Sequence, residues 1–164
     1  MNPTVNTAKV ANRRELRLNT IGELRAEVDR IVAADQAGTL SQLGNWTAGQ
    51  IFGHLAAWIN YAYDGFPIQR PPWFIRLMLR MQLRKYLKNG FPSGVRIPKV
   101  DNGTTGTERL STAEGSQRLR AALVRLESDE PAPHDSPAFG PMSHADRIQL
   151  NLRHAELHLS FLRY

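Results

Sequence analysis

Cysteine is absent from the chain. Its absence excludes a disulfide framework, a thiolate nucleophile and a cysteine-ligated metal, so any bound metal must use nitrogen or oxygen ligands. The first twenty residues contain no apolar run of the length found in signal peptides. No later stretch approaches the roughly 20 apolar residues of a membrane-spanning helix. These absences predict a soluble, cytoplasmic protein.

The period-two alternation of apolar and polar residues that is typical of strands is also absent over any convincing strand length. The 164 residues match one ordinary domain, and 41% of them are apolar, which is enough to form its core. The net charge of +6 raises the question of a nucleic-acid partner. However, the cations gather in "RRELR", in "RLMLRMQLRKYLK" and around positions 118–125 rather than alternating with aromatic side chains, and no nucleic-acid-binding motif occurs. We therefore expect no nucleic-acid partner.

Four segments begin with the same capping signal, a Ser or Thr followed three residues later by an acid or Gln. The pairs are Thr20 with Glu23, Thr47 with Gln50, Ser111 with Glu114, and Ser143 with Asp146. Apolar residues at helical spacing follow each start, and the last run comprises Ile148, Leu152, Leu159 and Leu162. These signals predict an all-α four-helix bundle over residues 20–164, preceded by a polar, partly flexible segment over residues 1–19.

The connection from Gly65 to Leu110 is too long for a plain loop and contains a candidate helix from Trp73 to Lys88. Cations recur there at every fourth position, at Arg76, Arg80, Arg84 and Lys88. We expect this basic stripe to lie opposite an apolar face formed by Phe74, Leu77, Met78 and Met81. The pattern favours an amphipathic helix that covers the bundle and leaves its charged face in water. The alternative is a helix that binds a membrane surface.

The last predicted helix carries two histidines four residues apart, His154 and His158. Four helical steps return a side chain to within about 40° of the first, one turn along, so both imidazoles lie on one face. Asn151 shares this sector of the helix. Position 155 is Ala, where the zinc-protease pattern HExxH has its general-base Glu, and Glu156 lies on the far side of the helix.

A third histidine, His54, lies at the edge of the apolar face of the second predicted helix, where it can face the pair. Three neutral imidazoles that converge on one divalent cation account for all three placements and leave a coordination position open for water or substrate. The alternative is a chance pair and an ordinary buried His54, because a pair at this spacing is weakly specific. His134 and His144 are weaker candidates, which we expect at the surface.

Together these features resemble the DinB/YfiT-like superfamily of four-helix-bundle metalloproteins, and within it a bacterial branch known only as a domain of unknown function. The resemblance rests on "GNWTAGQIFGHLAAWINYAYDGFP", on the "IP" turn at 97–98, on "SPAFGPMS" and on "HAELHLSFL". It implies a nickel or zinc ion held by His54, His154 and His158. One departure is Leu157, which stands where relatives often have the first member of a double histidine.

Three functional hypotheses remain open. The first is a divalent-metal-dependent enzyme with Trp58, Tyr61 and Asn151 lining the substrate site. The resemblance implies a thiol-dependent transferase or a hydrolase, with a small-molecule substrate and a low-molecular-weight thiol as reactant. The second is a non-catalytic helical module that uses its basic helix on an anionic membrane or protein partner. The third is a bundle that has kept the fold and lost the activity. A homodimer is a further expectation.

Overall fold

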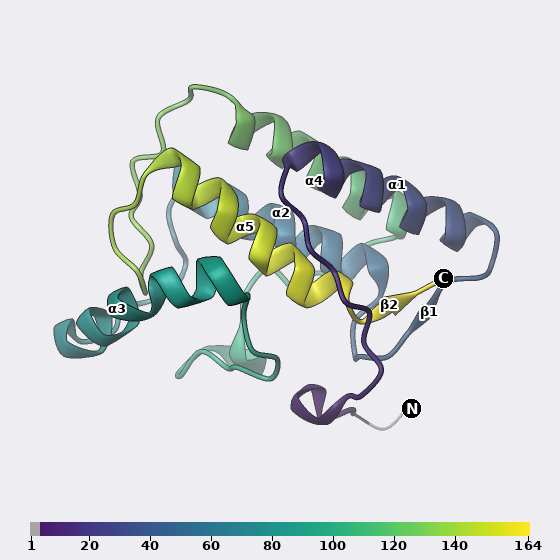
Figure 1. Ribbon diagram of the computed structural model, residues 1–164, viewed down its shortest axis with the longest axis horizontal. Helices are drawn as coiled ribbons and strands as arrows, with labels where there is room; N and C mark the ends of the chain where they lie inside the picture. Colours follow the sequence, from purple (N-terminus) through teal and green to yellow (C-terminus); the bar gives the residue numbers. More distant parts are fainter. Residues whose placement is uncertain (1–3) are drawn as a thin grey trace.

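The structure, a computed structural model, describes residues 4–164 and is mostly helical (Figure 1). Its α-helices are α1 (Ile21–Gln36), α2 (Ala48–Asp64), α3 (Trp73–Asn89), α4 (Thr112–Glu127) and α5 (His144–Leu159). The short elements are the 3-10 helices η1 (Thr7–Lys9) and η2 (Asp101–Gly103) and the strands β1 (Ser41–Gln42) and β2 (Leu162–Arg163). The predicted all-α class is therefore confirmed, and so is a helix inside the long connection between α2 and α4.

The predicted capping residues begin the four helices of the main core. Thr20, Thr47, Ser111 and Ser143 each accept a hydrogen bond from the backbone N–H three residues later. In α2 and α4 the third residue also bonds back to the N-cap backbone, so the capping box is complete. Thr47 thus fixes the residue at which α2, the helix that carries His54, begins.

Helices α1, α2, α4 and α5 enclose the main core. Figure 1 shows α1 and α4 side by side along one edge of the molecule, with α5 crossing in front of α2. The first turns of α2 and α4 approach closely, because a Cβ on Gly49 would lie 2.2 Å from the carbonyl oxygen of Leu110. A Cβ on Gly115 would lie 2.5 Å from the carbonyl oxygen of Gly49. Only glycine fits at these two positions without a shift of the backbone.

Helix α5 ends at Leu159, so the prediction that Leu162 continues its apolar run is wrong. Leu162 lies in β2 and pairs with Gln42 of β1 in an antiparallel bridge. Arg14 fixes this exit from the helix, because its Nε donates to the Leu162 carbonyl at 2.6 Å and its Nη2 to the Leu159 carbonyl at 3.3 Å. Leu162 is nevertheless fully buried in the main core, which explains why its spacing resembled that of a helix.

The segment before α1 packs along the bundle. Leu18 is buried in the main core, and its backbone N–H donates to the Glu156 carboxylate at 2.6 Å. The side chain of Asn45 bonds both to the backbone N–H of Val5 and to its carbonyl. The predicted partial flexibility of residues 1–19 stays a prediction, and residues 1–3 lie outside the described part of the chain.

Helix α3 packs by its C-terminal half, while its N-terminal end projects away from the other helices (Figure 1). Leu83 and Leu87 are buried against Phe139 in a second, smaller core. The prediction that the apolar face covers the bundle is wrong, because its four residues are exposed: Phe74, Leu77, Met78 and Met81. Apolar residues occur on nearly all sides of this helix, so periodicity alone did not decide which face is buried. Within the described residues, no helix combines the length and the apolar character needed to cross a bilayer.

Candidate metal centre

Three histidine rings meet between α2 and α5. The Nε2 atom of His54 lies 3.3 Å from Nε2 of His154, which lies 3.0 Å from Nε2 of His158. One ligand nitrogen from each ring lies within 4.8 Å of the other two. The structure thus brings together the three histidines that the sequence predicted as metal ligands.

Helix packing places these rings in a protected position. His54 is 1% exposed on α2, whereas His154 and His158 are half-buried on successive turns of α5. A buried imidazole loses its hydrogen bonds to water, so its ring nitrogens need other partners. The partners found here determine what the cluster can bind.

The first partner is a backbone carbonyl from the loop before α4. Nδ1 of His54 donates to the carbonyl oxygen of Thr105 at 2.8 Å. A neutral ring with its proton on Nδ1 has a lone pair on Nε2, and that atom faces the other histidines. Gly106 permits this approach, because its φ is +71° and a Cβ there would lie 2.7 Å from Cβ of Ala57 on α2.

Burial keeps all three rings neutral near pH 7. It lowers the pKa of His54 to about 4, although the hydrogen bond to Thr105 acts in the opposite direction. Burial also lowers the pKa of His154 well below its ordinary value, and the neighbouring His54 adds to this effect. The pKa of His158 is lowered in the same way, first by burial and then by the other two rings. Neutral imidazoles are the form that binds metal ions.

Hydrogen bonds among the rings cannot satisfy the cluster. Each Nε2 atom has one direction in the ring plane, occupied by either a proton or a lone pair. Nε2 of His154 therefore cannot form a full hydrogen bond to both neighbours, although both lie within 3.3 Å. A cation can instead accept one lone pair from each of the three rings, provided that His154 and His158 carry their protons on Nδ1. Nitrogens at about 2.0–2.1 Å from one ion are separated by roughly 2.9 Å in octahedral and roughly 3.3 Å in tetrahedral geometry, and the observed separations of 3.0 and 3.3 Å agree with these values.

Aromatic side chains enclose the cluster. The Trp46 ring stacks on His158 with centroids 5.3 Å apart and planes 14° apart, and its centroid lies 4.9 Å from that of His54. Trp58 lies 5.7 Å from His154 by ring centroids, and Phe91 lies 6.1 Å from the same ring. These walls reduce contact with water and hold the rings in place.

The predicted substrate-site residues lie at different distances from the histidines. Trp58 contacts two of the rings directly, with centroids 6.0 Å from His54 and 5.7 Å from His154. Tyr61 packs on the other side of Trp58, with centroids 5.8 Å apart. Asn151 donates to the carbonyl of Arg147 within α5 at 2.9 Å. A substrate role for these three residues stays a prediction.

Two buried polar atoms beside the cluster lack a hydrogen-bond partner among the described residues. They are the indole Nε1 of Trp58 and the hydroxyl Oγ1 of Thr105. Both belong to residues that contact His54, one through its ring and the other through its carbonyl. Burying a donor without a partner costs free energy of about 1–3 kcal/mol, so these atoms are candidates for binding a ligand at the histidines.

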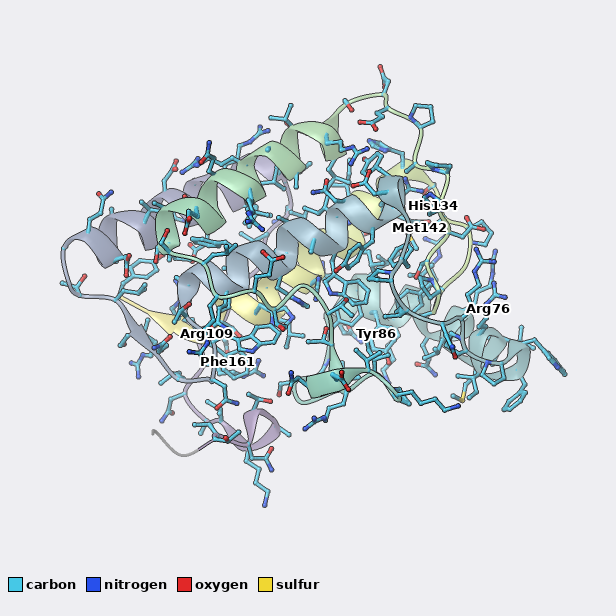
Figure 2. All side chains as sticks on the ribbon, turned by 180° about the vertical axis from the view of Figure 1, so that it is seen from behind. Arg76, Tyr86, Arg109, His134, Met142 and Phe161 are labelled. Carbon is cyan, nitrogen blue, oxygen red and sulfur yellow. The ribbon has the colours of Figure 1, made fainter. Side chains whose placement is uncertain are left out.

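The remaining histidines lie elsewhere, as expected. His134 and His144 are exposed, and Figure 2 shows His134 near Met142 at one end of the bundle, away from Phe161, which follows α5. Glu156 lies on the opposite side of α5 from the cluster, where its carboxylate accepts hydrogen bonds from Arg153 and from the backbone of Leu18. No general base is therefore provided at that position.

Three residues of the site were not predicted: Trp46, Phe91 and Thr105. Trp46 precedes the N-cap of α2, and Phe91 follows the end of α3, so neither belongs to a helical period. Thr105 acts through its backbone, which residue type does not indicate. The only available signal was the glycine at 106, which marks a close approach of the loop to another segment.

A family model described as "Protein of unknown function (DUF1569)" matches residues 10–164. No curated protein and no solved structure matches the chain. The match spans all three histidines and both helices that carry them, but its description assigns no activity. The function therefore has to be inferred from the chemistry of the site.

Proposed function

The chain belongs to the DUF1569 family of unknown function, and we propose that it is a divalent-metal-dependent enzyme. In this proposal His54, His154 and His158 hold one zinc or nickel ion. The supporting observation is the separation of their Nε2 atoms, 3.3 and 3.0 Å, together with the lone pair that the bond to Thr105 leaves on His54. Nitrogen ligands suit both metals.

A divalent ion in such a site is a Lewis acid and lowers the pKa of a water molecule or thiol that binds to it. The chain's own residues orient and protect the reactants. Thr105 fixes the tautomer of His54, while Trp46 and Phe91 limit access of bulk water. The Trp58 indole N–H and the Thr105 hydroxyl are free to donate to a polar group of the substrate.

The resemblance of the sequence motifs to those of DinB/YfiT-like metalloproteins, stated above as an expectation, favours the same ligand set. It also favours a thiol-dependent transferase or a hydrolase over other reaction classes. In the proposed reaction the substrate is a small molecule, and the reactant activated at the site is a low-molecular-weight thiol or water. The aromatic walls made by Trp46 and Trp58 suit a substrate with an apolar portion.

Metal analysis of the purified, tag-free protein tests the ligand set. We expect one zinc or nickel ion per chain in the native protein, and loss of the ion in His54→Ala and His154→Ala. The matched controls are His134→Ala and His144→Ala, which remove exposed histidines outside the cluster. Substoichiometric metal, or equal metal content in His154→Ala and His144→Ala, contradicts the proposal.

Cobalt substitution tests the reactant. A cobalt-loaded protein is expected to show a sulfur-to-cobalt charge-transfer band when a low-molecular-weight thiol is added, because the ligand set leaves a coordination position open. Absence of the band, with water exchange still detected, excludes a thiol reactant and leaves hydrolysis. Absence of both excludes an open coordination position and therefore the proposed enzyme.

A further inference from the structure

The positive charge of this protein is concentrated in one stretch. Residues 65–100 contain eight Lys and Arg and no Asp or Glu, whereas the rest of the chain has thirteen Lys and Arg against fifteen Asp and Glu. The whole excess of positive charge therefore lies between α2 and η2, and about half of this stretch is α3. Among the described residues, Arg84 is the one cation of this stretch with an ion pair, to Asp146 at 3.3 Å.

Helix α3 also exposes an unusual set of large apolar side chains. Trp73 is 75% exposed and Met81 is 70% exposed, and the three others of this group are more than half exposed: Phe74, Leu77 and Met78. They lie on the outer side of the helix, opposite the side that buries Leu83 and Leu87. Contiguous exposed apolar side chains of this kind mark an interaction surface.

Lys85 and Lys88 continue this outer side toward the C-terminal end of α3 and are exposed. Arg80 and Arg84 are also exposed but flank the outer side nearer to the bundle, where Arg84 pairs with Asp146 of α5. The long stems of these side chains can lie along an apolar surface while their charged groups reach polar phosphates. Figures 1 and 2 agree that the N-terminal end of α3, where Figure 2 labels Arg76, projects beyond the bundle. The outer side is therefore free to contact a flat partner.

A second copy of the chain is a poor partner for this surface. A two-fold interface along α3 would bring the same cations of both copies together with no acid from residues 65–100 to neutralise them. An anionic bilayer suits both the apolar side chains and the cations of this surface. Its acyl chains accept the apolar side chains, and its lipid phosphates and carboxylates attract the cations. Charge complementarity therefore favours an anionic membrane over a second copy of the chain as the partner of this surface.

We propose that the outer side of α3 docks the protein on an anionic membrane surface, with Trp73, Leu77 and Met81 inserted at the acyl boundary. The helix lies in the plane of the surface and does not span the bilayer, in agreement with its length of about 25 Å. Phe91, two residues after the end of α3, contacts the His154 ring. The docked helix therefore ends beside the candidate metal centre, although the docking does not depend on a metal.

Vesicle co-sedimentation of the full chain tests the docking. We expect binding to phosphatidylcholine vesicles that contain phosphatidylserine, little binding to phosphatidylcholine alone, and release by high salt. Each cation near the surface contributes about fivefold in affinity. The variant Arg80→Gln/Lys85→Gln/Lys88→Gln should then bind roughly a hundredfold more weakly. The variant Leu77→Ser/Met81→Ser should weaken binding by at least about tenfold.

The matched control is Arg118→Gln/Arg120→Gln/Val124→Ser, which removes one exposed and one half-buried cation and an exposed apolar side chain from α4. It should bind like the wild type. Quenching of tryptophan fluorescence by brominated acyl chains should disappear in Trp73→Phe, while that variant still sediments with vesicles. Equal binding to neutral vesicles, no binding, or equal weakening in the α4 control overturns the proposal. Self-association that is lost in Leu77→Ser/Met81→Ser without vesicle binding also overturns it, in favour of a dimer interface.

Discussion

Glu27 carries a buried negative charge that ties three parts of the chain together. Its side chain is 2% exposed and accepts hydrogen bonds from Arg14 at 2.5 Å, from Arg30 at 2.9 Å and from Tyr164 at 3.0 Å. Burial acts to raise the pKa of this carboxyl, but the hydrogen bonds from Arg14 and Arg30 outweigh it and lower the pKa below 4.5. The ionised form is therefore the one that stabilises the fold.

Glu27→Gln is expected to lower the free energy of unfolding by about 3 kcal/mol near neutral pH, because Arg14 loses its buried partner. The folded-state pKa lies below the unfolded one, so the stabilisation is present above pH 4.5 and is lost as the pH falls through the folded-state value. Urea unfolding at about pH 7 and about pH 3.5 should show the difference between wild type and variant shrinking in acid. Glu108→Gln, at an exposed ion pair with Arg118, should change stability by less than about 1 kcal/mol at either pH. A difference that grows in acid would contradict this account.

At the scale of single residues, the sequence predicted the three histidines that cluster but not the residues that support them. His154 and His158 were recognisable because helix geometry alone puts positions four apart on one face. His54 could be predicted as their partner because it interrupts an apolar face. The contacts of Trp46 and the carbonyl of Thr105 depend instead on how distant loops pack, which no local pattern encodes.

Among the elements, the contact of α2 with α4 depends on a pair of glycines. Gly49→Ala is expected to destabilise the protein by about 2 kcal/mol, because the new Cβ meets the backbone of Leu110 and Ser111, which cannot move like a side chain. Gly22→Ala in α1 is the matched control, since its Cβ would have no neighbour closer than 3.7 Å. The control should leave stability unchanged or raise it by about 0.5–1 kcal/mol. Thermal unfolding followed by circular dichroism distinguishes the two, and similar melting temperatures for both variants would show that the contact is not tight.

Element boundaries and element orientation differed in how well they could be predicted. The four capping pairs located the starts of α1, α2, α4 and α5, because capping is a local interaction between residues three apart. The buried face of α3 could not be predicted from the helix alone. Leu83 and Leu87 are buried because they pack against Phe139, which lies in a loop far away in the sequence. The two-residue pairing of β1 with β2 was too short to produce an alternating pattern.

At the scale of the whole molecule, the candidate metal centre joins two helices that lie far apart in sequence. His54 comes from α2, and the other two histidines come from α5, about one hundred positions later. A metal that binds the folded state and not the separated ligands must therefore stabilise the entire bundle. The size of that effect follows from mass action.

Zinc at a hundred times its dissociation constant should add about 2.7 kcal/mol to the free energy of unfolding. For a chain of this length the melting temperature should then rise by about 5–10 °C, and a chelator should reverse the rise. His158→Ala should melt at the same temperature with and without zinc, because two nitrogens on two helices hold the ion far more weakly than three. His144→Ala, at the exposed start of α5, should keep the full zinc-induced rise. A rise of equal size in both variants would place the bound ion outside the cluster, since only the first variant removes one of the three converging nitrogens.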